Sequence, residues 1–267
     1  MTRIALGISY DGASFHGWQY QGAKVATVQD SVQRALTSIA DHPVTVTCAG
    51  RTDAGVHATN QVVHFDSDAS RDPRAWMMGS NARLPDTISA TWVREVSTTF
   101  DARHSATSRR YLYLIMNNKI RSALMPGFVT REHRPLDAER MHDSAQSLLG
   151  ENDFSSFRAA NCQSRTAMRN IQHIRVSRAG ELVIIDVAAN AFLHHMVRNI
   201  AGVLMDVGCG SETVSWTGEL LALRDRTRAG ITARPNGLYM VQVDYPEIHG
   251  LPGGPALPHF LGNLPIA

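Results

Sequence analysis

Apolar residues recur with two different periods along the chain, which predicts short strands alternating with amphipathic helices. In residues 3–10 every second side chain, such as Ile4 and Leu6, is apolar, as expected for one face of a strand. In residues 28–41 the apolar positions follow helical spacing, and Thr27 precedes them as an N-cap. The same patterns predict further strands at 44–49, 61–66 and 87–96, and a helix at 73–81 with Pro73 in its first turn.

The second half of the chain repeats this order of elements. Strands are predicted at 110–116, 168–177, 181–188 and 238–243, and helices at 137–149, 192–207 and 215–224. Each half therefore reads β-α-β-β-α-β, which is the order of a ferredoxin-like split βαβ unit. We expect an α+β protein made of two such fused units, with mixed or antiparallel sheets side by side and a central cleft. The expected parts are residues 1–105, residues 106–245 and a Pro/Gly-rich segment, 246–267.

Composition excludes several classes of protein. The 43% hydrophobic content of the 267 residues is that of a folded globular protein. No run of about 18 apolar residues predicts a membrane span, and the chain starts directly in a strand pattern rather than a signal peptide. The three cysteines form no C-x-x-C pair, which favours a reduced, cytoplasmic location, and Cys48 is expected to pack inside a strand.

Basic residues are unevenly distributed although the net charge is only +2. Apart from Lys24 and Lys119 they are all arginines, for which the genome's base composition is a sufficient reason. Residues 158–178, however, contain five arginines and no acid. Such a patch either is a solvated face or binds phosphates, because the planar guanidinium matches phosphate geometry.

The stretch CAGRTDAGVHA, residues 48–58, combines candidate chemistry with a tight turn. Gly50 and Gly55 flank Asp53, and glycine permits close approach of another molecule. The neighbouring guanidinium of Arg51 would either keep the carboxylate ionised or hold a phosphate. Taken alone, the pattern is more typical of an aspartate that bonds its own backbone in a turn.

Motifs for cofactors and metals are missing from the sequence. It has no HExxH, EF-hand, GxGxxG or GxxxxGK[ST] pattern, and no GxSxG nucleophile elbow, so no cofactor is expected. His194 and His195 fall in a predicted helix, where adjacent side chains point about 100° apart, so we expect them not to share an ion and one to pack in the core.

Two tyrosines follow a pair of arginines in the predicted strand 110–116. Tyr111 and Tyr113 alternate and so share a face. Aromatic side chains beside arginines on a sheet either pack in the core or stack bases in nucleic-acid-binding proteins. Tyr10 and Trp18, in the stretch YDGASFHGWQ, are expected to serve packing.

Together these segments resemble a known family. The stretches YDGASFHGWQ, CAGRTDAGVHA, FDARHSATSRRYLYLI, GENDFSSFR, NAFLHHMVRNIAG and NGLYMVQVDYP occur in the order found in TruA-type tRNA pseudouridine synthases, from residue 3 to residue 246. The resemblance implies an isomerase that converts uridine to pseudouridine at positions 38, 39 and 40 in the anticodon stem-loop of tRNAs. It also implies a homodimer that binds tRNA and flips out the target base without a cofactor.

The resemblance assigns roles residue by residue. Asp53 matches the catalytic carboxylate, Arg51 an RNA-contacting residue, and Tyr111 the aromatic residue that packs on the uracil. Arg198 matches a basic residue of the substrate pocket and Leu238 an apolar wall. Two RNA-contacting segments are implied: Phe100, Asp101, Ala102, Arg103 and His104 in the first, and Asn161, Cys162, Gln163, Ser164 and Arg165 in the second.

The residues leave other functions open. A base-removing RNA glycosidase would use a similar carboxylate but release free uracil. A non-catalytic RNA-binding module could be built on the same split βαβ sheets. Even for an isomerase, the sequence leaves open whether the carboxylate attacks the sugar, attacks the uracil or removes the 2′ proton.

Overall fold

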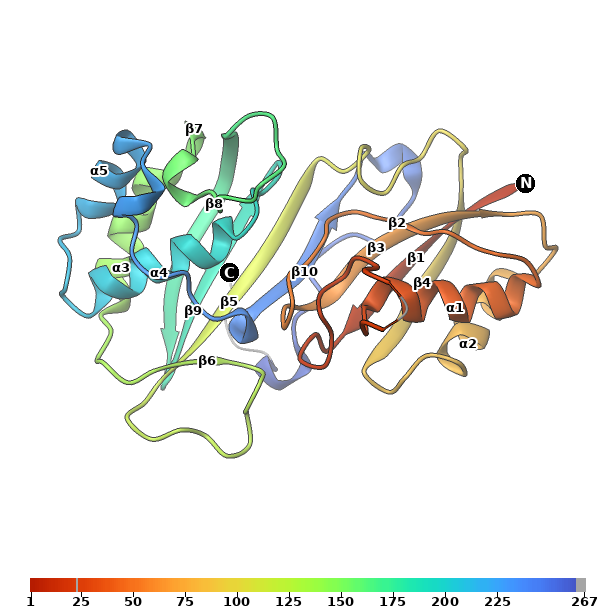
Figure 1. The fold of residues 1–267 in the computed structure, drawn as a ribbon, viewed down its shortest axis with the longest axis horizontal. Coiled ribbons are helices and arrows are strands. Elements are labelled where there is room, and N and C mark those ends of the chain that lie inside the picture. The colour runs from red at the N-terminus through yellow and green to blue at the C-terminus, as the bar shows by residue number, and fades with distance from the viewer. Residues whose placement is uncertain (23, 263–267) are drawn as a thin grey trace. The chain divides into compact units, whose positions relative to one another are not determined.

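Two units make up the structure, a computed structural model that describes residues 1–22 and 24–262 (Figure 1). The first contains Met1–Ser108 and Tyr239–Phe260, and the second contains Arg109–Leu238 with Leu261 and Gly262. The chain leaves the first unit after Ser108 and returns to it at Tyr239. The expected division kept 106–245 together and set 246–267 apart; of that last segment, residues 263–267 lie outside the described residues.

The first unit follows the predicted order of elements. Its elements are β1 (Thr2–Tyr10), α1 (Val28–Ala40), β2 (Thr47–Cys48), β3 (His57–Ser67), α2 (Pro73–Asn81), β4 (Ile88–Val96) and β10 (Leu238–Asp244). Its sheet has the order β4-β1-β3-β10, and β2 pairs with β3. Strand β1 is antiparallel to β3 and β4, whereas β10 is parallel to β3, so the sheet is mixed.

Helices α1 and α2 pack beside each other on one face of this sheet (Figure 1). The Thr27 side chain accepts a hydrogen bond from the amide of Asp30 and caps α1, as predicted. Trp76 of α2 packs edge-on against Phe65 of β3, with ring centroids 5.1 Å apart. Because strand side chains alternate, His64 and Asp66 point to the opposite face of the sheet.

The second unit also packs helices against a sheet. Its elements are β5 (Ser108–Asn117), β6 (Thr130–Glu132), α3 (Ala138–Ala145), β7 (Gly150–Asp153), β8 (Met168–Ala179), β9 (Leu182–Ala189), α4 (Met196–Gly208) and α5 (Trp216–Leu223). The order of its strands is β5-β9-β8-β7, and β6 pairs in parallel with β5. The short strands β6 and β7 were not predicted, since neither contains enough residues to show a period.

Several predicted elements differ from those observed, and β3 starts at His57 instead of residue 61. Strand β2 is only Thr47–Cys48, because the amides of Val44 and Val46 donate to side chains of α1 instead of a strand partner. Helix α3 ends at Ala145 and continues as a 3₁₀ turn, Gln146–Leu148. The helix predicted at 192–207 begins only at Met196. No helix within residues 1–22 and 24–262 combines the length and apolarity needed to cross a membrane.

The apolar stripe of α1 gives a test of this core. Leu36 is fully buried there, so Leu36→Ala removes packed methyl groups and is expected to lower the free energy of unfolding by about 2–5 kcal/mol. Arg34→Ala, at an exposed position of the same helix, serves as the control and should cost at most about 0.5 kcal/mol. Urea denaturation followed by circular dichroism measures both; equal effects would contradict the assigned helix face.

Candidate active site

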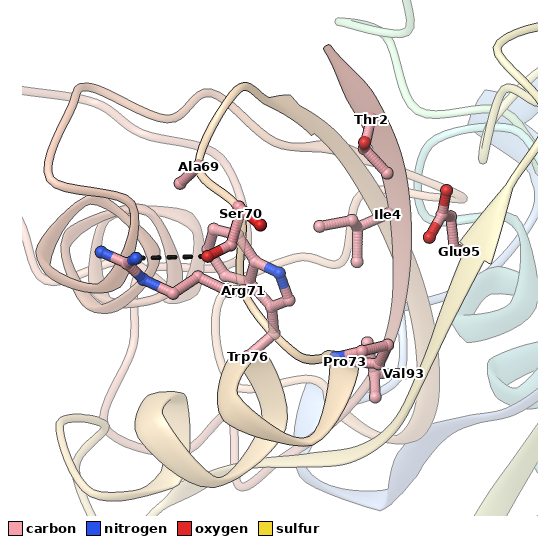
Figure 2. Close-up of a pocket in the computed structure, with 9 residues that line it drawn as sticks. All are labelled: Thr2, Ile4, Ala69, Ser70, Arg71, Pro73, Trp76, Val93 and Glu95. Atoms are coloured by element: carbon pink, nitrogen blue, oxygen red, sulfur yellow. Dashed lines mark hydrogen bonds between the residues drawn. The ribbon is translucent and has the colours of Figure 1, made fainter.

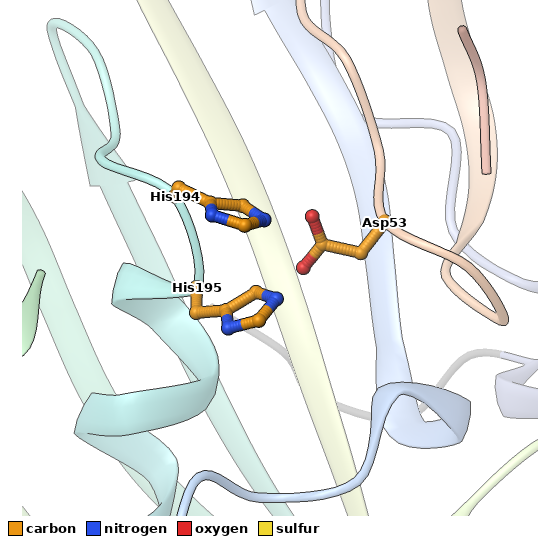
Figure 3. Close-up of side chains that lie close together, drawn as sticks. All are labelled: Asp53, His194 and His195. Carbon is orange, nitrogen blue, oxygen red and sulfur yellow. The ribbon is translucent and has the colours of Figure 1, made fainter. Parts of the chain in front are cut away.

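Asp53 lies at the tip of the loop between β2 and β3 in the first unit. Its side chain is half-buried, Thr52 before it is buried, and Arg51 and Ala54 are exposed. The backbone turns sharply here, since the amide of Val56 donates to the carbonyl of Asp53 at 3.1 Å. Figure 3 shows the Asp53 carboxylate projecting away from its own loop. The loop therefore presents the carboxylate instead of folding it back as an ordinary turn-former.

A second loop, residues 11–19, supports the Asp53 loop from behind. The amide of Trp18 donates to the carbonyl of Thr52 at 3.0 Å, and the hydroxyls of Tyr10 and Thr52 lie 2.8 Å apart. Tyr10 and Trp18 are both buried, which confirms their predicted packing role. Gly55 adopts a left-handed φ of 77° and its amide donates to Phe15 at 3.4 Å.

Two glycines of this supporting loop touch the backbone of the Asp53 loop directly. A Cβ on Gly12 would lie 1.9 Å from the carbonyl oxygen of Val56. A Cβ on Gly17, whose φ is +89°, would lie 2.7 Å from the carbonyl oxygen of Thr52. No larger residue fits without moving backbone, so the Asp53 loop is fixed by main chain packed on main chain.

The two tyrosines of β5, Tyr111 and Tyr113, have different surroundings in the second unit. Tyr113 is fully buried, and its hydroxyl lies 2.7 Å from both the Thr130 hydroxyl and the Arg234 carbonyl. Burial raises the pKa of Tyr113 far above its usual value. Tyr111 keeps 8% of its surface exposed, and its ring meets Phe192 edge-on at 5.0 Å. Tyr113 is therefore a core residue, whereas Tyr111 has an orientation fixed by an aromatic neighbour.

Arg198, on the first turns of α4, is oriented by a backbone carbonyl. Its Nε donates to Ala233 at 2.9 Å, and the Ala233 amide donates back to the Arg198 carbonyl at 3.2 Å. Buried Asn199 holds the same segment, since its Oδ1 accepts from Thr232 at 2.7 Å and from Arg226 at 3.1 Å. Neither Asn199 nor Arg226 could be found from sequence, because a hydrogen bond between side chains far apart in the chain leaves no periodic pattern.

Leu238, the first residue of β10, is buried with 6% of its surface exposed. Gly237 just before it packs closely, because a Cβ there would lie 2.4 Å from the Leu114 carbonyl oxygen. The close packing of Gly237 against the Leu114 carbonyl thus fixes the position of the apolar Leu238 side chain.

The first predicted RNA-contacting segment has a buried half and an exposed half. Phe100 and Ala102 are completely buried, Asp101 is half-buried, and Arg103 and His104 are exposed. Asp101 Oδ1 accepts hydrogen bonds from the amides of Arg103 and His104, each at 2.8 Å. Of this segment, only Arg103 and His104 have side chains positioned to meet a ligand; the other three shape the turn.

The second predicted segment, residues 161–165, is held by arginines. Arg158 Nη2 donates to the carbonyls of Cys162 and Ser164, each at 2.7 Å, and Arg169 donates to the Ser164 hydroxyl at 2.6 Å. Burial raises the pKa of Cys162, but donors from Ser164, His194 and Arg158 outweigh it and lower the pKa. The exposed side chains are Asn161, Gln163 and Arg165.

Contrary to the sequence prediction, His194 and His195 do not lie in a helix. They precede α4 instead of lying in it, because His195 adopts a left-handed φ of 61°. His194 is exposed and His195 half-buried, so neither packs in the core. Their rings lie beside each other, with centroids 3.9 Å apart and an interplanar angle of 39° (Figure 3). The expectation that they point about 100° apart on a helix was therefore wrong.

A small cavity of about 170 Å³ lies elsewhere in the first unit (Figure 2). It is lined by Thr2, Ile4, Ala69, Ser70, Arg71, Pro73, Trp76, Val93 and Glu95. Thr2 pairs with Ser67, whereas the Asp53 loop joins β3 beside the other end of β1, where Tyr10 pairs with Ala58. Arg71 bonds the carbonyls of Ile39 and Ser70. The cavity is thus separate from the Asp53 loop.

Comparisons with known proteins establish the family. A family model described as tRNA pseudouridine synthase matches residues 7–105 and 144–246. The tRNA pseudouridine synthase A of Pseudoalteromonas atlantica is 57% identical over 261 residues, which cover 98% of this chain and 99% of that protein. That of Cronobacter sakazakii is 54% identical over 263 residues, covering 98% of this chain and 97% of that protein.

Among solved structures, the archaeal box H/ACA sRNP Nop10-Cbf5 complex aligns with 76% of this chain and 43% of its own at 11% identity, with a TM-score of 0.34. The two sequence relatives and the family model decide the class: the protein is an isomerase. The chain belongs to the tRNA pseudouridine synthase family, which confirms the resemblance of its motifs.

The contact between Gly12 and Val56 can be tested. We expect Gly12→Ala to push the Asp53 loop forward and to reduce isomerase turnover about 100-fold, the effect of a displacement of about 1 Å at a candidate catalytic group. Gly253→Ala is the matched control, since a Cβ there meets no atom within 4 Å, and it should leave turnover unchanged. Release of tritium from C5-labelled uridine in tRNA measures the rate; normal turnover of Gly12→Ala would contradict a backbone-fixed loop.

Proposed function

We propose that this protein isomerises uridine to pseudouridine at positions 38, 39 and 40 of the tRNA anticodon stem-loop, with Asp53 as its catalytic carboxylate. The observation that carries the proposal is the support of the Asp53 loop by backbone contacts from Gly12 and Gly17. A fixed, half-buried carboxylate at the tip of a loop can meet a flipped-out nucleotide without rearranging. The family of the chain supplies the reaction.

The reaction balances without an external reactant. The bond from the sugar C1′ to uracil N1 breaks, the base turns, and a bond from C1′ to C5 forms. The proton leaves C5 and N1 gains one, so nothing is oxidised or reduced. A single carboxylate can therefore carry the chemistry without a cofactor, provided that water is kept from the loosened base.

Second-unit residues are proposed to hold the substrate. Tyr111, whose ring is steadied by Phe192, packs on the uracil, and Leu238 supplies an apolar wall. Arg198, whose Nε is oriented by the Ala233 carbonyl, contacts the substrate through its guanidinium group. Each of the three is held before the substrate arrives, which lowers the entropic cost of binding.

Exposed basic side chains are proposed to bind the tRNA backbone. Arg51, Arg103, His104 and Arg165 are all exposed and lie on loops next to ordered elements. Stacking and phosphate contacts together offset the few kcal/mol that flipping a base costs. Phe100, Asp101, Ala102, Cys162 and Ser164 act indirectly by shaping these loops.

We further propose that each half is a ferredoxin-like unit and that two copies act together as a cytoplasmic homodimer. The order β4-β1-β3 with β2 beside β3 supports the first statement for the first unit. The motif resemblance supports the dimer. The free cysteines Cys48, Cys162 and Cys209 support the cytoplasmic location.

The direct test replaces the carboxylate by its amide. Asp53→Asn is expected to abolish isomerisation but to keep tRNA affinity within about threefold, because the amide retains the shape while losing the charge and basicity needed in the reaction. An unmodified tRNA transcript is incubated with the enzyme, and pseudouridine is mapped around the anticodon arm.

Asp86→Asn, at an exposed turn position, is the control and should leave turnover unchanged. Turnover retained by Asp53→Asn would remove Asp53 from the mechanism. Pseudouridine outside the anticodon arm would refute the proposed positions, and released uracil would indicate base removal.

A salt titration tests the RNA contact of residues 161–165. Arg165→Ala is expected to weaken tRNA binding and to reduce the slope of log affinity against log salt by about one, because fewer counterions are released. Arg74→Ala, on the first turn of α2 at the end of the sheet away from Asp53, is the control. Equal slopes for the wild type and Arg165→Ala would show that this segment faces away from the RNA.

A further inference from the structure

The turn that exposes Arg103 and His104 is tied to the sheet face opposite α1 and α2. Phe65 points to α2, so its neighbours His64 and Asp66 point to the other face. In the register of the sheet, Arg3 of β1 lies opposite Asp66 of β3. Strands β1 and β3 lie next to each other in the sheet of the first unit, and Arg3 and His64 contact residues 98–102.

Arg3 bonds a carboxylate and two carbonyls at once. Its Nε and Nη2 donate to both carboxylate oxygens of Asp66, at 2.8 and 2.7 Å. Its Nη1 donates to the carbonyls of Thr98 and Phe100, each at 2.7 Å. The Arg3 guanidinium lowers the pKa of Asp66, so the pair stays charged throughout the neutral range. Asp66 therefore fixes the orientation of the Arg3 guanidinium, which in turn holds the backbone of residues 98–100.

His64 binds the next peptide group along. The amide of Ala102 donates to His64 Nδ1 at 3.0 Å, which requires this nitrogen to be unprotonated. The Ala102 carbonyl accepts from the Tyr245 hydroxyl at 2.6 Å, so both polar groups of this buried peptide are satisfied. Phe100 packs edge-on against His64, with ring centroids 5.9 Å apart.

The surroundings of His64 favour its neutral form. Burial lowers the pKa of His64 below its ordinary 6.5, and the charge of Arg3 lowers it further. Asp101 and Asp66 act in the opposite direction without reversing the shift. His249, which follows β10, also packs edge-on against Phe100, with ring centroids 5.0 Å apart. The bond to Ala102 is thus intact above pH 6.5 and is lost as pH falls through the lowered pKa.

We propose that Arg3, Asp66 and His64 form a latch that orders residues 98–105 for tRNA binding, and that protonation of His64 releases it. The proposal rests on the proposed function in one respect, namely that Arg103 and His104 contact the tRNA. Protonated Nδ1 would point a hydrogen at the Ala102 amide, and two donors cannot pair. The turn formed by Asp101 would then lose its hydrogen bond to His64. Its two basic side chains, Arg103 and His104, would no longer be held in fixed positions. These three are positioning residues, since none of them touches the substrate.

Two substitutions at His64 separate the latch from general packing. His64→Asn keeps an acceptor at the position of Nδ1 but does not titrate, whereas His64→Leu removes the acceptor. At about pH 7.5 we expect His64→Asn to bind unmodified tRNA like the wild type, and His64→Leu to bind about five- to tenfold more weakly. As the pH is lowered through the lowered pKa of His64, the wild type should come to bind several-fold more weakly than His64→Asn. Titration of other histidines affects both proteins equally and cancels in this ratio.

Hydrogen exchange of the Ala102 amide tests the latch without tRNA. Its protection relative to the amide of Leu6 in β1 should fall on acidification in the wild type, stay constant in His64→Asn, and be low throughout in His64→Leu. Protection that is independent of pH in the wild type would overturn the latch. The wild-type measurement needs no variant, so it stands even if His64→Leu fails to fold.

The two proposals fail in different ways. If Arg103→Ala binds tRNA as tightly as the wild type while Ala102 protection follows His64 as expected, the latch stands and the RNA contact of this segment is refuted. If Arg103→Ala weakens binding but the wild type and His64→Asn respond identically to pH, the RNA contact stands and the latch is overturned.

Discussion

The site depends on one steric constraint: main chain packs on main chain behind Asp53, with no side chain between. Gly12 and Gly17 leave room for the carbonyls of Val56 and Thr52, and those carbonyls define the path of the loop. A side chain can relieve a close contact by changing its rotamer, but a backbone packed directly against another backbone cannot. The loop that carries the Asp53 carboxylate is thus fixed by steric contact although it belongs to no helix or strand.

Arginines supply much of the remaining order. Arg3, Arg158 and Arg198 each donate to backbone carbonyls and so tie down irregular segments that lack their own secondary structure. The arginine-rich composition therefore has two uses within the described residues. Part of it is structural, with the planar fork bridging several acceptors, and part, such as exposed Arg165, lies on the surface. Counting charges along the sequence does not distinguish the two.

Elements with a clear period were predictable from sequence, and contacts without one were not. Helix α2 begins at Pro73 and ends at Asn81 as predicted, and α1 has the predicted cap and buried face. The late start of α4 was missed because a single left-handed residue, His195, interrupts an apolar run. For the candidate site, the motif located Asp53 and its exposed neighbours, but burial alone separates Tyr113 from Tyr111. The return of β10 to the first unit left no trace in local sequence.

That return has a consequence for how the protein is made. Strand β10 pairs in parallel with β3, so the first unit recruits a strand that is translated after the second unit. A nascent chain emerging from the ribosome completes the core of the second unit while His57 and Ala58 of β3 still lack their β10 partners. Unpaired edges invite wrong partners, and the interval before Tyr239 emerges is thus the vulnerable stage of biosynthesis.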